Sequence, residues 1–247
     1  MKYRTLLLST LVAWLVCCAA GARAAEAVWA QGITEPLNDV TMSSPIIGIV
    51  GARPFEEGDL VKKGQVVLEL EKRFEELEVQ RKQLIRDQAK IELDRIKSLA
   101  AKNAISVSRE ELDKKEAEFK VASVESELAQ EQLRKRLLLA PFDGFITDIY
   151  RDVGEGCEAQ QPLLRIVDTR RCYFTSNLEA KTGYGLKVGQ KVRLEIEAGA
   201  SPVTFDGTIS YVSPVVDPAS GLLKVKAIFD NPDGRIRPGV AGRMMLP

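Results

Sequence analysis

The sequence predicts a mixed α and β protein in which a helical hairpin splits a small β-domain, with a second β region following. Three observations carry this prediction. The stretch GIVGARPFEEGDLVKKGQ at residues 48–65 has a second copy, GFITDIYRDVGEGCEAQQ, at residues 144–161. Between the copies, residues 71–139 contain neither Pro nor Gly and are rich in good helix formers. After the second copy, short runs of alternating apolar and polar residues are separated by turn residues, which is typical of β-strands.

The N-terminus has the composition of a secretory signal. Two basic residues precede an apolar run at residues 6–20, and Ala22-Arg23-Ala24 supplies a small-residue end. The run is shorter than the ~20 residues that span a bilayer, which favours cleavage over an uncleaved membrane anchor. We predict a signal peptide at residues 1–24 and an extended segment at residues 25–44.

The four cysteines fall into two groups. Cys17 and Cys18 lie in the predicted signal and allow a lipoprotein alternative, which is disfavoured because neither follows a small residue. Cys157 and Cys172 lie in strand-like surroundings. A disulfide is possible in an exported protein, but we favour two buried thiols.

The composition excludes several classes of function. Thirty-five basic residues balance thirty-five acidic ones, so no excess of positive charge indicates a nucleic-acid partner. The chain has no histidine, which removes His-metal sites, Ser-His and Cys-His nucleophiles, and the commonest general base. Phosphate-binding glycine loops are also missing. We therefore predict a protein that is not an enzyme, with no catalytic residues, no cofactor and no metal site.

The repeat predicts one β-domain made of two halves, residues 45–70 and 140–168. Because each copy alternates apolar residues with glycine turns, each is expected to form short strands, and two such half-units bury one shared core. One turn differs, since Gly64 is replaced by Gln160 in the second copy. The matched pairs are Gly48 and Gly144, Gly58 and Gly154, Gln65 and Gln161, Leu68 and Leu164, and Leu70 and Ile166.

The region between the halves, residues 71–139, predicts a helical hairpin with coiled-coil packing. A break at residues 101–108 divides it, and Ser108 to Glu111 forms a capping box for the second helix. Ala140-Pro141 is expected to end that helix. The seam is predicted from residues that recur every seven positions. They are Leu70, Leu77, Leu84 and Ile91 before the break, and Leu112, Phe119, the polar exception Ser126, and Leu133 after it.

Residues 169–247 predict an antiparallel barrel or sandwich. Four alternating stretches indicate its strands: YFTSNLEA, GQKVRLEIEA, TFDGTISYVS and LLKVKAIFD. The segment NPDGRIRPG has turn chemistry and is interpreted as a plain connection between strands.

This order of elements resembles the periplasmic adaptor, or membrane fusion protein, family of Gram-negative tripartite efflux and secretion systems. The segments that carry the resemblance are LLLAPFDGFITDIYRDVGE, QPLLRIVD, and residues 216–240. The resemblance implies a split lipoyl-like β-domain interrupted by an α-helical coiled-coil hairpin, followed by a small antiparallel β-barrel. In lipoyl carriers the modified lysine lies where the helices stand here, so the resemblance implies no swinging cofactor.

The resemblance also implies partners and a location. An adaptor links an inner-membrane transporter to an outer-membrane channel, forms a ring-like homo-oligomer, and lies in the periplasm beside the inner membrane. The alternative is an exported coiled-coil scaffold or binding protein without a transport role. Many members continue into a membrane-proximal domain, whereas this sequence stops at Pro247. The family's Arg-Thr pattern after the Asp-Pro-Ala turn is also replaced here, by Ser220-Gly221-Leu222.

The predicted site is the hairpin tip. Arg95, Leu99 and Ser106 have the spacing that resembles the motif by which exporter adaptors engage channel tips. Arg95 and Leu99 are four residues apart and share a helix face. The structural alternative is that Leu99 closes the coiled-coil seam, Ser106 caps a helix, and Arg95 is an ordinary solvated charge.

Overall fold

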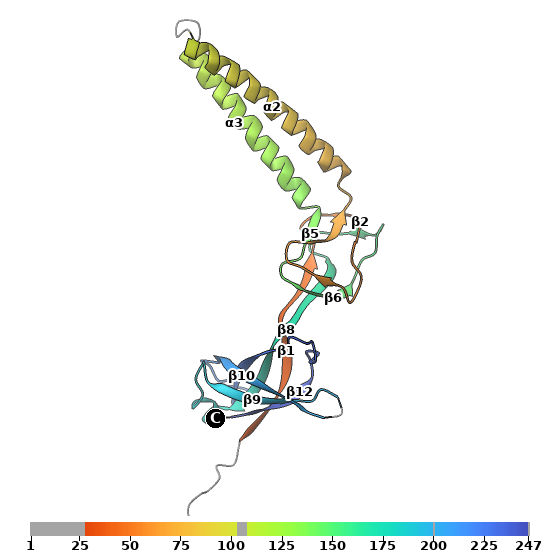
Figure 1. Cartoon of the computed structure of the whole chain (residues 1–247), viewed down its shortest axis with the longest axis vertical. Coiled ribbons are helices and arrows are strands. Elements are labelled where there is room, and N and C mark those ends of the chain that lie inside the picture. The colour runs from red at the N-terminus through yellow and green to blue at the C-terminus, as the bar shows by residue number, and fades with distance from the viewer. Residues whose placement is uncertain (1–27, 103–107, 200, 247) are drawn as a thin grey trace, which may run out of the picture. The chain divides into compact units, whose positions relative to one another are not determined.

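The computed structural model describes residues 28–102, 108–199 and 201–246 (Figure 1). The predicted signal peptide lies outside this range. Contacts divide the chain into two compact units. Of the described residues, one unit contains those up to Thr34, those within Tyr173–Phe229 and those from Gly239, and the other contains those within Glu35–Cys172 and Asp230–Pro238.

The first unit is a closed six-stranded antiparallel barrel. Its strands have the order β1-β12-β9-β10-β11-β8, and a β1–β8 pairing closes it. They are β1 (Trp29–Ser43), β8 (Pro162–Glu179), β9 (Lys191–Ile196), β10 (Val203–Val212), β11 (Leu222–Asp230) and β12 (Ala241–Met245), with a short helix α4 (Ala180–Gly183) after β8. Alternate residues point inward, as in β9, where Val192, Leu194 and Ile196 are buried. The predicted barrel is therefore confirmed.

Two predicted boundaries differ from the structure. The segment at residues 25–44 was expected to be merely extended, but it contains β1, whose Trp29 to Ile33 pair with β12. The predicted start of the barrel domain at residue 169 falls inside β8, which runs on to Glu179. Because a continuous strand has no turn residue to mark a boundary, the sequence carries no signal at the division between Cys172 and Tyr173.

The second unit contains the split β-domain, which both copies of the repeat build together. Its strands are β2 (Gly48–Ala52), β3 (Leu60–Val61), β4 (Val66–Leu70), β5 (Leu137–Leu139), β6 (Gly144–Ile149), β7 (Gly156–Cys157) and the first part of β8. One sheet has the order β5-β4-β2-β7, and β3 pairs with β6, which pairs with β8. The core draws Val50, Leu68 and Leu70 from the first half and Ile146, Leu164 and Ile166 from the second.

Reciprocal hydrogen bonds join the two halves. The N–H of Gly58 donates to the carbonyl of Ile146 at 2.8 Å, and its equivalent, Gly154, donates to Val50, the equivalent of Ile146, also at 2.8 Å. Gly58 and Gly154 have φ of +94° and +92°, which only glycine adopts without strain. The second turn of each half makes an equivalent pair of hydrogen bonds. In the second half, Gln160 takes the place of glycine in this turn and has a φ of +65°.

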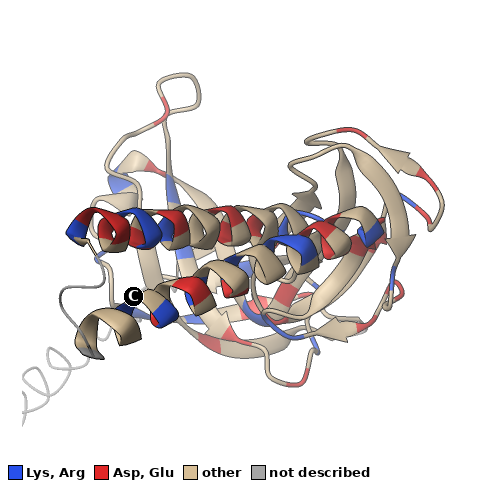
Figure 2. Cartoon of the chain, turned by 90° about the horizontal axis from the view of Figure 1, so that it is seen from above, with Lys and Arg blue, Asp and Glu red and all other residues tan. Residues whose placement is uncertain are grey.

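The hairpin consists of α2 (Arg73–Lys102) and α3 (Arg109–Arg134), which pack side by side (Figure 1). Basic and acidic residues are interspersed along both helices (Figure 2). Ser108 caps α3 as predicted, because its Oγ accepts a hydrogen bond from the N–H of Glu111 at 3.0 Å. The predicted end of α3 is wrong. The helix stops at Arg134, and the three leucines that follow form β5, paired with β4.

The predicted seam is right for α3 and wrong for α2. On α3, Ser126 is buried and Leu112, Phe119 and Leu133 are half-buried. On α2, Leu77, Leu84 and Ile91 are 47%, 71% and 69% exposed. The α2 seam instead uses a second seven-residue frame two positions later, in which Val79 and Leu93 are buried and Arg86 and Ala100 are half-buried. The frame that is buried mixes apolar with charged residues, whereas the exposed face has the stronger apolar repeat. The sequence pattern therefore predicted the wrong face of α2.

Candidate functional site

The structure leaves the two described residues of the predicted tip site exposed. Arg95 and Leu99 lie in the last two turns of α2, and Leu99 is 43% exposed. Their neighbours Ile96 and Ala100 are half-buried and continue the seam frames toward the tip. Leu99 therefore does not close the seam, which removes that structural alternative for this residue. Ser106 lies outside the described residues.

The helices are held together close to the tip by an ion pair. Lys97 Nζ lies 2.9 Å from Glu116 Oε1 across the hairpin. The Lys97 ammonium lowers the pKa of Glu116, chiefly through a hydrogen bond. An exposed pair of this kind contributes little stability. Arg95 and Leu99 lie on either side of Lys97 in the chain and are both exposed.

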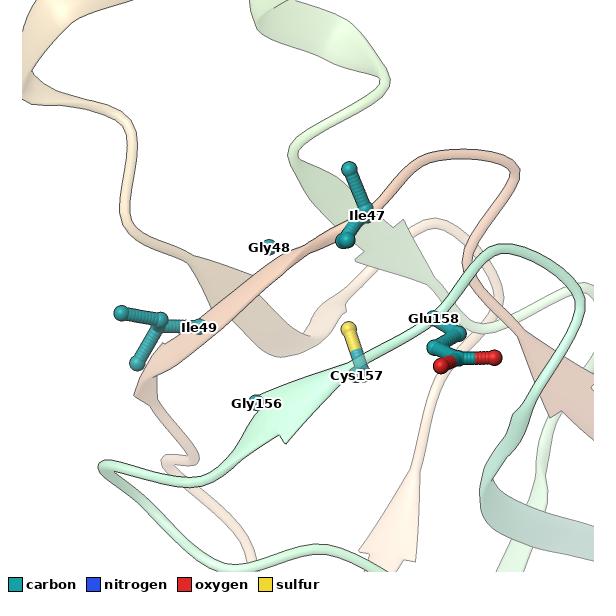
Figure 3. Close-up of a pocket in the computed structure, with 6 residues that line it drawn as sticks. All are labelled: Ile47, Gly48, Ile49, Gly156, Cys157 and Glu158. Carbon is teal, nitrogen blue, oxygen red and sulfur yellow. The ribbon is translucent and has the colours of Figure 1, made fainter.

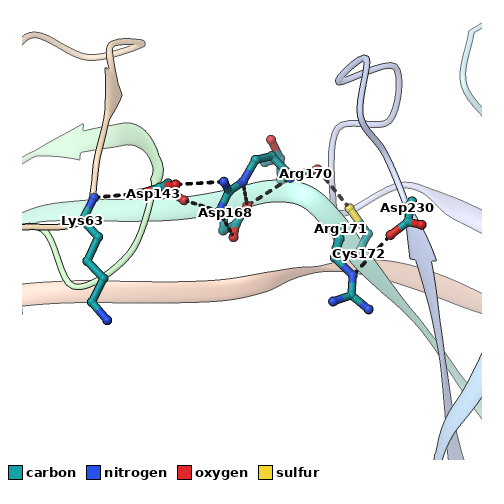
Figure 4. Close-up of polar contacts among 8 residues, drawn as sticks. Lys63, Asp143, Asp168, Arg170, Arg171, Cys172 and Asp230 are labelled. Atoms are coloured by element: carbon teal, nitrogen blue, oxygen red, sulfur yellow. Dashed lines mark hydrogen bonds and ion pairs between the residues drawn. The ribbon is translucent and has the colours of Figure 1, made fainter.

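A second polar cluster joins the split β-domain to β8 (Figure 4). Arg170 donates from Nε and Nη2 to the two carboxylate oxygens of Asp168, both at 3.0 Å, and from Nη1 to Asp143 at 3.0 Å. Burial would raise the pKa of Asp168, whose side chain is only 3% exposed, but the hydrogen bonds from Arg170 outweigh burial and lower that pKa. The N–H of Lys63 donates to Asp143 at 2.8 Å, lowering its pKa as well. Every carboxylate is matched, which indicates a structural clamp.

The polar groups of the NPDG turn are also hydrogen-bonded within the protein. Asn231 is buried, and its amide donates to the carbonyls of Thr169 and Ile236, both at 2.9 Å. Cys172, also buried, has a thiol pKa raised to about 11 by burial. Cys157 is likewise buried and free, so the preference for two buried thiols agrees with the structure. A thiol that stays protonated is a poor nucleophile.

An open cavity of about 470 Å³ lies beside the β2–β7 pair (Figure 3). It is lined by Ile47, Gly48, Ile49, Gly156, Cys157 and Glu158. A neighbouring groove shares Gly48 and Ile49 and reaches Phe74 and Arg136 at the base of the hairpin. This surface was not predicted from the sequence. The signal for it was Ile47 and Ile49, two large apolar residues beside Gly48.

Across the described ranges, no cluster of three or more His, Cys, Asp or Glu side chains could hold a metal ion. Within the same ranges, no helix is long and apolar enough to cross a membrane. The described surface carries exposed apolar side chains and ion pairs along the helices.

Comparisons with known proteins agree with this arrangement. Residues 178–247 match the family model of the CusB-like beta-barrel domain. The chain is 26% identical over 213 residues to the cobalt-zinc-cadmium resistance protein CzcB of Cupriavidus metallidurans, covering 79% of this chain and 40% of that protein. It is 24% identical over 236 residues to the solvent efflux pump periplasmic linker SrpA of Pseudomonas putida, covering 87% of this chain and 59% of that protein. The chain thus spans about half the length of these relatives.

A solved structure shows the same fold. A MacA-MexA chimeric protein, which contains the α-hairpin domain of Pseudomonas aeruginosa MexA, superposes with a TM-score of 0.76 at 21% identity. The match covers 88% of this chain and 80% of the chimera. The predicted fold class, a split lipoyl-like β-domain with a coiled-coil hairpin and a barrel, is confirmed. In sequence and in fold, this chain is related to the periplasmic adaptors, or membrane fusion proteins.

Proposed function

We propose that the chain is the periplasmic adaptor subunit of a transmembrane efflux or secretion system, where it links an inner-membrane transporter to an outer-membrane channel. The observation that carries this proposal is the exposed hairpin end. Arg95 and Leu99 stand outside the seam on a helix pair that leaves a β-domain whose two halves are interlocked. A rigid base with an exposed tip suits a protein that spans a gap between two partners.

The proposed location and assembly follow from the same comparison. The relative SrpA is named a periplasmic linker. This name supports the placement of the present chain in the periplasm, beside the inner membrane and the transporter. We propose that the barrel contacts the transporter and that several copies form a ring. Weak contacts in each copy then add together through multivalency.

The proposed channel-binding residues are Arg95, Leu99 and Ser106. A photo-crosslinking residue in place of Leu99, in cells that express the full chain, should capture an outer-membrane channel protein. The double variant Arg95→Asp with Leu99→Glu should abolish both capture from a neighbouring tip position and export. Both described residues are off the seam, so helix content and thermal stability should remain nearly unchanged.

A matched control makes the same charge change elsewhere on α2. Lys90→Asp with Gln80→Glu also alters two exposed side chains and shifts the net charge by the same amount, but away from the tip. This control should keep capture and export. If the tip variant still captures the channel, or if the control loses capture equally, the tip assignment is wrong. If the photo-crosslinking residue at position 99 captures no outer-membrane protein, the result favours the alternative of a scaffold without a transport role.

A further inference from the structure

Exposed apolar side chains of the barrel gather at one of its two ends. This end, the α4 end, is where β8, β10 and β12 finish and where β1, β9 and β11 begin. Among the described residues of the barrel unit, every large apolar residue that is exposed lies there, except Ile33 in the wall of the barrel. The residues at the α4 end are Val28, Tyr184, Val188, Tyr211 and Val215.

Backbone and packing contacts bring the parts of this end together. The N–H of Leu246, just after β12, donates to the carbonyl of Val28 at 2.9 Å. The loop after α4 enters β9 beside β10, since the N–H of Gly189 donates to a carbonyl of β10 at 2.8 Å. α4 itself packs on β11, because a Cβ at Gly183 would lie 2.8 Å from the side chain of Leu223.

The most exposed of these side chains stand on turns that their own hydrogen bonds hold closed. Tyr184 is 76% exposed, Val188 65% and Val215 68%. The N–H of Tyr184 donates to the carbonyl of Ala180 at 3.0 Å. Ser213 Oγ donates to the carbonyl of Val215 at 2.7 Å. These backbone groups are therefore satisfied within the protein, while the apolar side chains beside them contact water.

Lysines accompany the apolar residues at the α4 end. Lys181, Lys187 and Lys224 are exposed, and none of the three forms an ion pair with another described residue. The acidic residues described at this end are Glu179 and Asp217. Asp217 already accepts hydrogen bonds from its own turn. The free charge at the α4 end is therefore mainly positive.

This combination of side chains fits the surface of an anionic lipid bilayer. A tyrosine has an apolar ring and a polar hydroxyl, which suits the boundary between acyl chains and headgroups. Apolar side chains at the tips of turns can enter that boundary, and lysines around them are attracted to anionic headgroups.

The start of β1 gives a separate argument for a membrane. Val28 lies at the α4 end, and the apolar run of the predicted signal closes at Ala20. The chain between these two residues spans at most about 30 Å even when it is fully extended. Until the signal is cleaved, a run held in the membrane therefore keeps the α4 end within reach of lipid.

We propose that the α4 end of the barrel binds an anionic lipid bilayer directly. Tyr184, Val188 and Val215 enter the headgroup region, and the lysines contact lipid phosphates. This contact goes beyond the proposed function, in which the barrel contacts a transporter protein. It rests on that function only for which membrane the barrel meets.

Flotation with lipid vesicles tests this binding without any transporter. The chain from Ala25 onward is used, because it keeps every described residue and lacks the apolar run that would bind lipid by itself. It should float with vesicles of mixed phosphatidylethanolamine and phosphatidylglycerol, and much less with phosphatidylcholine alone. Added salt should weaken the binding by screening the lysines. If the chain does not bind the anionic vesicles at any lipid concentration, the proposal is wrong and a protein partner is left for this end.

Two serine substitutions test the apolar contribution. Tyr184→Ser with Val188→Ser should weaken vesicle binding at least about tenfold, since two apolar side chains no longer enter the interface. The matched control, Ile47→Ser with Ile49→Ser, also removes two exposed apolar side chains, but from the split β-domain. It should bind as the unmodified chain does. Equal losses in the two variants, or no loss in the first, would overturn the assignment to the α4 end.

Charge reversal tests the lysines and does not depend on the apolar variant remaining folded. Lys181→Glu with Lys187→Glu should weaken binding to the anionic vesicles at least about tenfold. Lys114→Glu with Lys120→Glu makes the same change of charge at two exposed positions of α3 and should have little effect. If both pairs weaken binding equally, net charge and not the α4 end accounts for it.

Fluorescence quenching locates the surface that meets the lipid. In the chain from Ala25 onward, Trp29→Phe removes the one remaining tryptophan, so Tyr184→Trp adds a single reporter. Brominated lipids should quench its emission. Ile33→Trp in the same background should not be quenched, because Ile33 lies in the wall of the barrel. Quenching at position 33 that equals or exceeds quenching at position 184 would show that the wall, and not the α4 end, contacts the bilayer.

Discussion

The split β-domain and the helical hairpin keep their apolar side chains in opposite places. In the β-domain, Leu68, Leu163, Leu164 and Ile166 are completely buried. In the hairpin, Leu84 and Ile91 are about 70% exposed, while the seam residue most deeply buried on α3 is a serine, Ser126. The β-domain therefore buries its apolar residues in a core, whereas the hairpin leaves many of its own exposed.

This difference shows that an apolar repeat identifies one face of a helix but does not identify what packs against that face. A seven-residue repeat predicts that one side of a helix is covered, but the cover can come from the same chain or from another. The hairpin is joined to its base by a specific contact, in which Arg136 donates to Glu75 at 2.6 Å.

The largest expected effect is in the core of the β-domain. Leu164→Ala removes a completely buried side chain that the two halves of the repeat share, and it should lower the free energy of unfolding by about 2–5 kcal/mol. Urea unfolding followed by circular dichroism would measure this. A loss below about 1 kcal/mol would mean that the core collapses around the gap and that the halves are less interdependent than their hydrogen bonds indicate.

Two leucines of α2 give a matched test of the corrected seam. Leu93→Ala should destabilise the hairpin by about 2 kcal/mol, because Leu93 is buried against α3. Leu84→Ala should change stability by less than about 0.5 kcal/mol in dilute protein, because the side chain is exposed. Hydrogen exchange of the helix amides would resolve both. The reverse order of effects would restore the seam that the sequence predicted.

The buried serine offers an expected gain. Among the described residues, Ser126 Oγ has no hydrogen-bond partner. Ser126→Ala removes this unsatisfied hydroxyl and should stabilise the hairpin by about 1 kcal/mol. Ser123→Ala is the control, since Ser123 Oγ donates to the carbonyl of Phe119 at 2.8 Å and its removal gains less. Equal thermal shifts in the two variants would show that helix propensity alone explains the gain.

The smallest effect concerns the one turn where the halves differ. Gln160 has a φ of +65°, where a side chain is strained, and Gly64 takes the equivalent position in the first half. Gln160→Gly should stabilise the domain by about 0.5 kcal/mol, since the relief of strain exceeds the added chain entropy of glycine. Gly64→Ala should destabilise it. A loss of stability in Gln160→Gly would mean that the glutamine side chain contributes more than the turn conformation costs.

The β-domain could be predicted from the sequence because its cause is local and repeated. Glycine at Gly58 and Gly154 marks the same positive φ twice, and the matched apolar pairs fall in one core. The strand β5 was missed because Leu137–Leu139 have good helix propensity, and only pairing with β4 makes them extended. The first barrel strand was missed because its partner, β12, lies some two hundred residues away along the chain.

For the candidate site, the sequence placed Arg95 and Leu99 on one helix face but could not decide between seam and surface. That decision depended on which of two seven-residue frames α3 covers. The residues that α3 buries are the small Ala122, Ser126 and Ala129, and such residues do not stand out in a pattern of large apolar side chains. The exposed Leu77, Leu84 and Ile91 were visible in the sequence as an apolar repeat, but they were assigned to the seam.

The entry and exit of the hairpin have a consequence for how such proteins can change. The hairpin leaves from β4 and returns into β5, and these strands are direct neighbours, with Val66 opposite Leu139 and Glu69 opposite Leu137. The β-domain is therefore connected to the hairpin through two adjacent chain ends. Inserting or deleting equal numbers of heptads in both helices would alter the reach of the hairpin by about 10 Å per heptad without disturbing the base. The length of the hairpin can thus change, to suit partners of different height, while the fold stays the same.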